Sequence, residues 1–266
     1  MPGVKVESKL QPDSLQERYA LVKDRVAAAA RMSGRAPESI ILVAVTKFAE
    51  SDQVRTLVEL GHRDFGENRV QHLIQQAAMV EEFLARARML PGAAKVSSEP
   101  VRWHMIGHLQ RNKARKVVEF ARLIHSVDSL RLAEELQQIA LRREQSIEVL
   151  LQVNCSGERS KFGCPVPAAI ALAEQIDTML NVRVRGLMTM AALDADEAET
   201  RATFARCREL FEEMKKIGIG EGRFDLLSMG MTNDFEAAIA EGANIVRIGT
   251  AIFGAPKNPP PEDDEE

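Results

Sequence analysis

Hydrophobic and polar positions follow a block pattern that repeats from about residue 40 to residue 250. Each block begins with a short apolar run rich in β-branched residues, passes through a polar turn and ends in a segment with helical spacing. The predicted strands are 40–47, 63–66, 101–106, 123–127, 147–153, 182–190, 224–229 and 244–250. About eight strands alternating with helices predict an α/β fold, a (β/α)8 barrel of the TIM type, with an open doubly wound sheet as the alternative.

An additional helix is predicted before the first strand. Ser14 and Glu17 have the spacing of a capping box, and apolar residues then follow helical spacing at Leu15, Tyr19, Leu21, Val22 and Val26. Later helices are expected at 69–89, from about 112, from 128 or 129 to 143, and at 165–180, 196–216 and 234–241. The glycines at 218–222 end a helix and precede a strand, which is the wrong context for a nucleotide-binding loop.

The first predicted strand ends on Lys47. A run that is apolar on both faces suits a parallel sheet covered by helices on both sides, and ligand sites in such folds lie at the carboxyl ends of the strands. We therefore interpret Lys47 as a chemical group. The alternative is a lysine that marks the exit of the strand into solvent.

Arg247 lies inside the last predicted strand, which would pair with the first strand in a closed barrel. A buried guanidinium needs a partner, and two neighbouring cations favour an anionic or polar ligand. Burial and a nearby positive charge also lower the pKa of a lysine, which favours Schiff-base formation at Lys47. A barrel-closing ion pair between Arg247 and a carboxylate is the alternative.

The last two strands end in small and hydroxyl-bearing residues. Ser228 and Met229 end one strand, and Gly249 and Thr250 end the next. Loops after the last two strands of a barrel frequently form a phosphate site. A ligand that carries both an aldehyde and a phosphate would suit this site together with Lys47.

The histidines do not predict a metal site. His104 and His108 are spaced by four residues, but they belong to a strand that Gly107 interrupts, so no zinc is expected. Cys155 is interpreted as a buried structural thiol. Ordinary structural or surface roles are expected for the remaining histidines: His62, His72 and His125.

Composition narrows the class of protein. The net charge of the 266 residues is −4, and the last five residues are all acidic, so the rest is nearly neutral and no nucleic-acid partner is expected. Three cysteines without a CxxC pair indicate a reducing cytoplasm. We expect neither a membrane span nor a signal peptide, since no apolar run is long enough for the first and residues 1–8 lack the apolar core of the second. We expect one domain at 13–255, with flexible tails at 1–12 and 256–266.

Several ordered motifs together resemble the YggS/PROSC family of pyridoxal phosphate homeostasis proteins. The motifs are at residues 45–47, 65–68, 103–113, 157–163, 185–188, 227–231 and 246–254. The resemblance implies a fold like the N-terminal barrel domain of alanine racemase, with pyridoxal 5'-phosphate (PLP) as the cofactor, bound as a lysine aldimine. Lys47 resembles the Schiff-base lysine, and Arg247 resembles the residue that faces the pyridine nitrogen.

The other implied site residues match the family motifs by position. Ser228, Met229, Gly249 and Thr250 resemble a phosphate cradle, while Asn68 and His104 resemble residues that line the ring. The resemblance implies a protein that holds PLP and releases it to PLP-dependent apo-enzymes, without strong catalysis. We expect a monomer or a weak homodimer.

Two enzymatic alternatives remain open. A PLP-dependent amino-acid racemase would use a lysine and a tyrosine on opposite faces of the cofactor, but the single tyrosine, Tyr19, precedes the barrel. An arginine opposite the pyridine nitrogen also weakens the cofactor as an electron sink. A phosphosugar aldolase that uses Lys47 is the third hypothesis. It predicts a purified protein without the absorbance of a PLP imine.

Overall fold

The computed structural model describes residues 14–89, 99–158 and 162–255. The tails predicted at 1–12 and 256–266, and the expected domain start at residue 13, lie outside these ranges. The strands are β1 (Ile41–Val45), β2 (Asp64–Glu67), β3 (Arg102–Met105), β4 (Ala121–Val127), β5 (Ile147–Asn154), β6 (Cys164–Pro165), β7 (Val182–Met188), β8 (Leu226–Ser228) and β9 (Ile245–Ile248). The α-helices are α1 (Leu15–Met32), α2 (Ser51–Glu59), α3 (Val70–Met89), α4 (Ala114–Val117), α5 (Leu130–Arg142), α6 (Val166–Asp177), α7 (Glu197–Lys216), α8 (Phe235–Ala240) and α9 (Thr250–Phe253).

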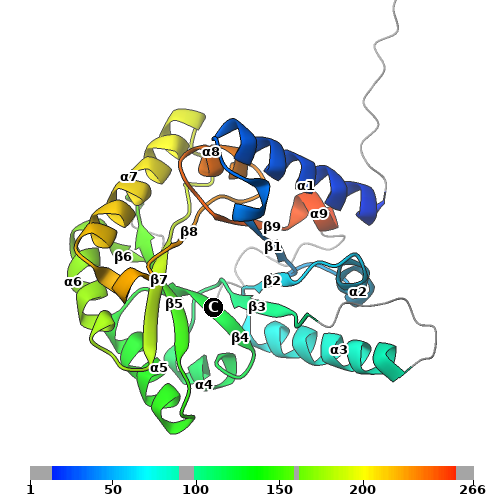
Figure 1. Cartoon of the computed structure of the whole chain (residues 1–266), viewed down its shortest axis with the longest axis horizontal. Coiled ribbons are helices and arrows are strands. Elements are labelled where there is room, and N and C mark those ends of the chain that lie inside the picture. Colours follow the sequence, from blue (N-terminus) through cyan, green and yellow to red (C-terminus); the bar gives the residue numbers. More distant parts are fainter. Residues whose placement is uncertain (1–13, 90–98, 159–161, 256–266) are drawn as a thin grey trace, which may run out of the picture.

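The strands close into a ring with helices outside it (Figure 1). Neighbours pair in the order β1, β2, β3, β4, β5, β7, β8 and β9, and β9 pairs with β1, all in parallel. The remaining strand, β6, has two residues and pairs only with the end of β5. The predicted (β/α)8 barrel is confirmed, and the open doubly wound sheet is excluded.

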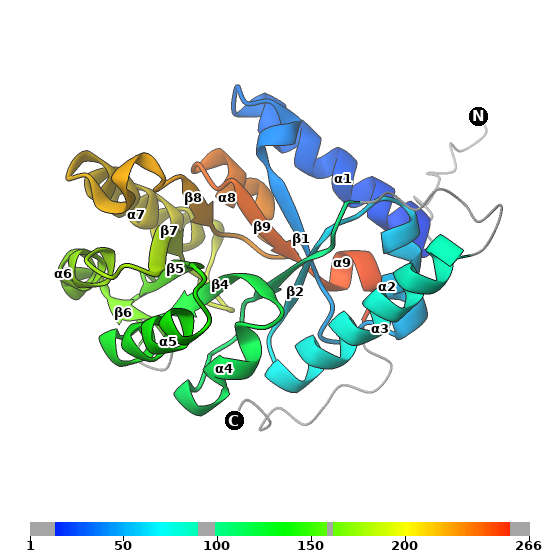
Figure 2. The ribbon, with the colours of Figure 1, turned by 60° about the horizontal axis from the view of Figure 1, so that its bottom comes forward.

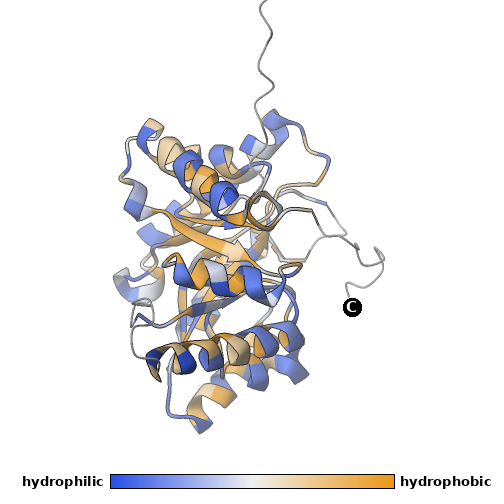
Figure 3. Cartoon of the chain, turned by 90° about the vertical axis from the view of Figure 1, so that its right-hand side faces the viewer, coloured by the Kyte–Doolittle hydropathy of each residue, from blue (hydrophilic) through white to orange (hydrophobic). Residues whose placement is uncertain are grey.

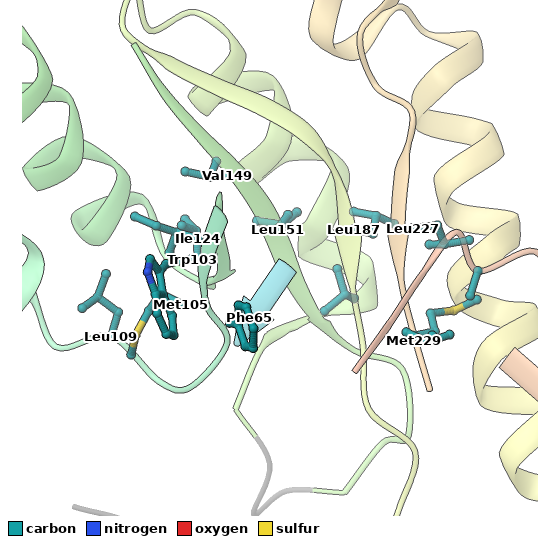
Figure 4. Close-up of a cluster of buried hydrophobic side chains, with 14 of the residues drawn as sticks. Phe65, Trp103, Met105, Leu109, Ile124, Val149, Leu151, Leu187, Leu227 and Met229 are labelled. Carbon is teal, nitrogen blue, oxygen red and sulfur yellow. The ribbon is translucent and has the colours of Figure 1, made fainter. Parts of the chain in front are cut away.

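Side chains alternate between the two faces of each strand, and this alternation divides the hydrophobic core into two parts. The larger part lies between strands and helices, and Figure 4 shows Phe65, Trp103 and Met229 in it. The smaller part contains inward-facing residues of the ring: Val43, Leu123, Leu150, Met188 and Ile245. In Figure 3 the strands are largely hydrophobic, while the helices in front of them carry both hydrophobic and hydrophilic residues.

The predicted first helix forms as expected. Ser14 accepts from the backbone of Glu17, and the Glu17 side chain accepts from the backbone of Ser14, which completes the capping box. Helix α1 packs against α8 and α9, on the side of the barrel that holds β1 and β9 (Figure 2). Leu21 was expected on the apolar face, but it is 47% exposed, because the buried face runs through Tyr19, Val22 and Val26.

Two predicted strand ends were wrong. The first strand ends at Val45, two residues before Lys47, and the last strand ends at Ile248, so that Thr250 begins the four-residue helix α9. The helix expected from about residue 112 starts where predicted, as a 3-10 turn at Arg111–Lys113 followed by the short α4. None of the helices in the described ranges is long and apolar enough to cross a membrane.

Candidate functional site

The carboxyl ends of the parallel strands form one mouth of the barrel, and Lys47 lies there. It follows the end of β1 by two residues, in a turn, and is exposed. Its Nζ atom lies 4.9 Å from the centroid of the Phe48 ring. Within the described ranges, no hydrogen bond or ion pair engages the amine, which leaves it available to a ligand.

A buried carboxylate holds the turn that carries Lys47. The Thr46 hydroxyl donates to the carboxylate of Glu67, which is fully buried at the end of β2, and the Thr46 N–H donates to Gly66 at 3.0 Å. On its other side Glu67 lies 3.3 Å from Nδ1 of His72. The hydrogen bond to Glu67 raises the pKa of His72 above its ordinary value, although partial burial opposes it. Glu67 thus links the side chain of Thr46, the residue before Lys47, to His72 in α3.

Arg247 is buried in β9 and has polar partners. Its Nη1 donates to the Ser228 hydroxyl at 2.5 Å, and its Nη2 donates to the Thr189 carbonyl at 3.0 Å. The ion pairs formed within the described ranges do not include Arg247, so the predicted partner exists but is not a carboxylate in a barrel-closing pair. Burial lowers the pKa of Arg247 to about 10, while Asp234 and Cys207 partly oppose this. The guanidinium therefore remains charged at neutral pH.

A chain of buried side chains continues from Ser228 through the barrel. The Ser228 hydroxyl lies 3.0 Å from Nδ1 of His125, and Nε2 of His125 lies 2.9 Å from Nδ1 of His104. The other ring nitrogen of His104 is 3.1 Å from Asp64, which also binds Arg102 at 2.6 Å. Burial would raise the pKa of Asp64, but hydrogen bonds from Arg102 and His104 outweigh it and hold this pKa well below its ordinary value.

Two histidines belong to this network. His125, for which a structural or surface role was expected, is fully buried and connects His104 to Ser228, which is a structural role. Both ring nitrogens of His104 are engaged inside the barrel, and its expected place beside a cofactor ring stays a prediction. His108 does not join it and stacks on Phe162, with ring centroids 4.2 Å apart. Sequence reasoning also missed Asp64, whose place at the start of a strand gave no signal.

The turns after β8 and β9 lie together at the mouth. The hydroxyls of Thr250 and Thr232 are 3.2 Å apart, and a Cβ added to Gly249 would lie 3.2 Å from the Val45 carbonyl. Because Thr250 begins α9, the first N–H groups of this helix have no partner within it. Such donors suit a phosphate group at this end of a barrel.

Ser228 and Met229, which were predicted for the phosphate cradle, have partners inside the barrel. The Ser228 hydroxyl already contacts Arg247 and His125. The Met229 side chain is buried in the outer core, and its N–H donates to the Ile245 carbonyl at 3.1 Å. The part of all four residues, Ser228, Met229, Gly249 and Thr250, in a phosphate cradle stays a prediction.

Asn68 is half-buried just after β2, at the same mouth. The turn after β3 reaches it because Gly107 has no side chain: a Cβ at Gly107 would lie 2.2 Å from the Asn68 carbonyl oxygen. The structure therefore gathers Lys47, Asn68, Gly249 and Thr250 around one opening.

Tyr19 lies toward the opposite end of the barrel. Its hydroxyl is 3.0 Å from Nδ1 of His62, and Nε2 of His62 is 2.7 Å from the backbone oxygen of Asp64, the first residue of β2. Lys47, in contrast, follows the carboxyl end of β1. The single tyrosine of the chain is therefore remote from the lysine.

Comparison with known proteins identifies the family. A family model of the alanine racemase N-terminal domain matches residues 22–257. The chain belongs to the alanine racemase N-terminal domain family. A relative in Pseudomonas aeruginosa, a pyridoxal phosphate homeostasis protein, is 40% identical over 242 residues, 91% of this chain and 96% of that protein. The resemblance to pyridoxal phosphate homeostasis proteins is thereby confirmed.

Solved structures of the alanine racemase N-terminal domain fold extend the comparison. PipY of Synechococcus elongatus, solved with PLP bound, is 35% identical with a TM-score of 0.72, and the match covers 88% of this chain and 100% of PipY. An alanine racemase of Clostridium difficile is 15% identical with a TM-score of 0.64, and the match covers 94% of this chain but 57% of the racemase. The second likeness shows the fold alone.

Proposed function

We propose that this protein binds pyridoxal 5'-phosphate and takes part in PLP homeostasis. The observation that carries the proposal is the match to PipY, which was solved with PLP bound and which this chain covers in full. The homeostasis relative in Pseudomonas aeruginosa supports the same role. The site fits the cofactor, because a free amine, a buried cation and unpaired helix N–H groups surround one mouth.

In this proposal Lys47 supplies the amine that captures the cofactor aldehyde. Gly249 and Thr250 hold the phosphate, Arg247 faces the pyridine nitrogen, and Asn68 lies beside the ring. Bound PLP supplies an electron-withdrawing ring conjugated to the captured carbon. Ser228, Met229 and His104 support the floor beneath these groups.

The arrangement favours a carrier over a catalyst. With a pKa of about 10, Arg247 stays protonated and cannot accept the proton of a pyridinium ring, so it favours the weakly electron-withdrawing form. A racemase also needs an acid or base on each face of its substrate, and Tyr19 is held by His62 toward the other end of the barrel. We therefore propose that PLP is held here, masked from side reactions, and passed to PLP-dependent apo-enzymes in the cytoplasm.

The first test of this proposal is cofactor capture. Protein incubated with PLP should gain a visible absorbance band, and borohydride reduction followed by peptide mapping should place the label on Lys47. Lys47→Ala should lose both the band and the label. Lys116→Ala is the matched control, because Lys116 is an exposed lysine in α4, and it should behave like the wild type. A label at any other lysine would contradict the site, and the absence of any band would contradict the function.

A second measurement separates carrier from racemase. The loaded protein is mixed with L-alanine or L-serine, and the D-enantiomer is followed by chiral chromatography. We expect no multiple turnover. Robust turnover that Lys47→Ala abolishes would establish the racemase instead.

A further inference from the structure

A continuous chain of polar side chains crosses the interior of the barrel. Asp64 and Arg102 are the first residues of β2 and β3, while Ser228 is the last residue of β8. The chain therefore begins at the amino ends of the strands and reaches the mouth where Lys47 lies. His104 and His125 join its two ends.

The chemistry of the two ends fixes the direction of the hydrogen bonds. Arg247 can only donate, so the Ser228 oxygen accepts from it. The ionised carboxylate of Asp64 can only accept, so Nε2 of His104 donates to it. When both rings are neutral, Nε2 of His125 must donate to Nδ1 of His104. Nδ1 of His125 is then left to accept from the Ser228 hydroxyl.

The opposite direction would require an extra proton. If Nδ1 of His125 donated to Ser228, then Nε2 of His125 would accept from His104, which would also have to donate to Asp64. His104 would then be a buried imidazolium, beside an Asp64 that already has Arg102 as its counter-ion. Burying a further charge is unfavourable. The arrangement in which both imidazole rings are neutral places a proton on every donor and needs no extra charge.

We propose that His125 is a positioning residue for the cofactor site, which acts through Ser228 on Arg247. By accepting from Ser228, His125 aims the Ser228 lone pairs at Arg247 and so fixes the orientation of the guanidinium. Asp64 sets the tautomers of both histidines from the far end of the barrel. The inference rests on the proposed function, because it concerns the residue expected to face the pyridine nitrogen.

Charged groups contact this hydrogen-bonded network from three strands: Asp64 from β2, Arg102 from β3 and Arg247 from β9. Glu99 also pairs with Arg102, and Asp234 acts electrostatically on Arg247. The adjacent Ser126 provides an internal comparison, since its buried hydroxyl has no hydrogen-bond partner among the residues that the structure describes. Removing the Ser126 hydroxyl should therefore leave the hydrogen-bonded side chains from Asp64 to Arg247 in place.

The first test uses the cofactor-free protein, so it does not depend on PLP binding. Nitrogen-15 NMR of the imidazole rings at pH 7.5 should show the ring proton of both His104 and His125 on Nε2. In Asp64→Asn the new amide can donate as well as accept, so the fixed tautomers should be lost. A proton on Nδ1 of either ring, or a doubly protonated His104, would overturn the inference.

The second test compares two polar replacements of His125. In His125→Asn the side-chain oxygen can occupy the place of Nδ1 and still accept from Ser228, so PLP binding should stay close to that of the wild type. In His125→Gln the amide reaches the place of Nε2 and the acceptor for Ser228 is lost. The PLP dissociation constant should then rise about tenfold, as expected when a charge-assisted hydrogen bond is misaligned.

Ser126→Ala is the matched control on the same strand and should bind PLP as the wild type does. Circular dichroism and thermal unfolding establish that each variant is folded. Equal PLP affinity of folded His125→Asn and His125→Gln would overturn the inference. A wild-type protein that binds no PLP would instead overturn the proposed function, and the NMR result would still decide the direction of the chain.

Discussion

Gly107 decides how closely the turns after β2 and β3 approach each other. Its backbone does not have a positive φ, so an alanine could adopt its conformation, but the added Cβ would lie 2.2 Å from the Asn68 oxygen and 2.7 Å from the Asn68 Cα. These are backbone atoms, so the whole turn would have to move. A single missing methyl group therefore determines where Asn68 lies at the mouth.

Gly107→Ala should destabilise the fold by about 1 to 3 kcal/mol, as overpacking commonly does, and should weaken PLP binding. Denaturant unfolding and PLP titration measure the two effects. The control is Gly34→Ala: an added Cβ there meets nothing within 4 Å, but the backbone φ of +69° is strained. That variant should lose stability and keep PLP affinity. Unchanged PLP affinity in Gly107→Ala would contradict the role given to Asn68.

At the scale of elements, α1 completes the barrel where the helix after β9 has only four residues. It packs against α8 and α9, and Tyr19 joins it to His62 at the start of β2. His62 in turn binds the backbone of Asp64 at 2.7 Å. The position of α1 is thus linked to the strand that begins the buried polar chain.

The contact between Tyr19 of α1 and the buried His62 should make the stability of the protein sensitive to acid. Burial lowers the pKa of His62 to about 4, so the unfolded chain takes up this proton first as the pH falls. The stability that neutral His62 contributes to the folded state is fully present above pH 6.5, the ordinary pKa of histidine. It is lost progressively as the pH falls toward 4. The loss amounts to at most about 3 kcal/mol. Denaturant unfolding at pH 7.5 and about pH 4.5 should show a decrease in stability.

NMR titration of the His62 ring assigns this loss to its source, because burial also lowers the pKa of His125, which therefore contributes to the loss as well. The ring should stay neutral at pH 5 in the folded protein. A His62 that titrates near its ordinary pKa would contradict the burial that joins α1 to the barrel.

At the scale of the whole molecule, the ring of strands is closed, so the strands of the described residues leave no long edge to pair with another chain. Four large apolar residues in the described ranges are more than 80% exposed: Met32, Met89, Leu180 and Leu193. They come from separate elements and do not indicate an obligate interface.

Sedimentation velocity should therefore show a monomer at low micromolar concentration, with at most weak dimerisation as the concentration rises. A dimer that persists on dilution would contradict this expectation. Repeating the measurement with PLP present separates an intrinsic dimer from one that depends on the cofactor.

Several features were determined by the sequence alone, because they depend on local chemistry. Period-two and helical patterns set the alternation of strands and helices, and Ser14 with Glu17 fixed the start of α1. A lysine at the end of an apolar strand and an arginine inside another identified Lys47 and Arg247 as residues of interest, since burying a charge is costly wherever it occurs.

Only the tertiary structure decided the partners of these groups. Arg247 meets Ser228 and Thr189, and His125 meets a residue 103 positions away in the chain. Such contacts depend on the register of the closed ring and on which side chains alternate inward, and no local pattern records either. For that reason His125 and Asp64 looked ordinary along the chain, and became parts of one hydrogen-bonded network only when the barrel closed.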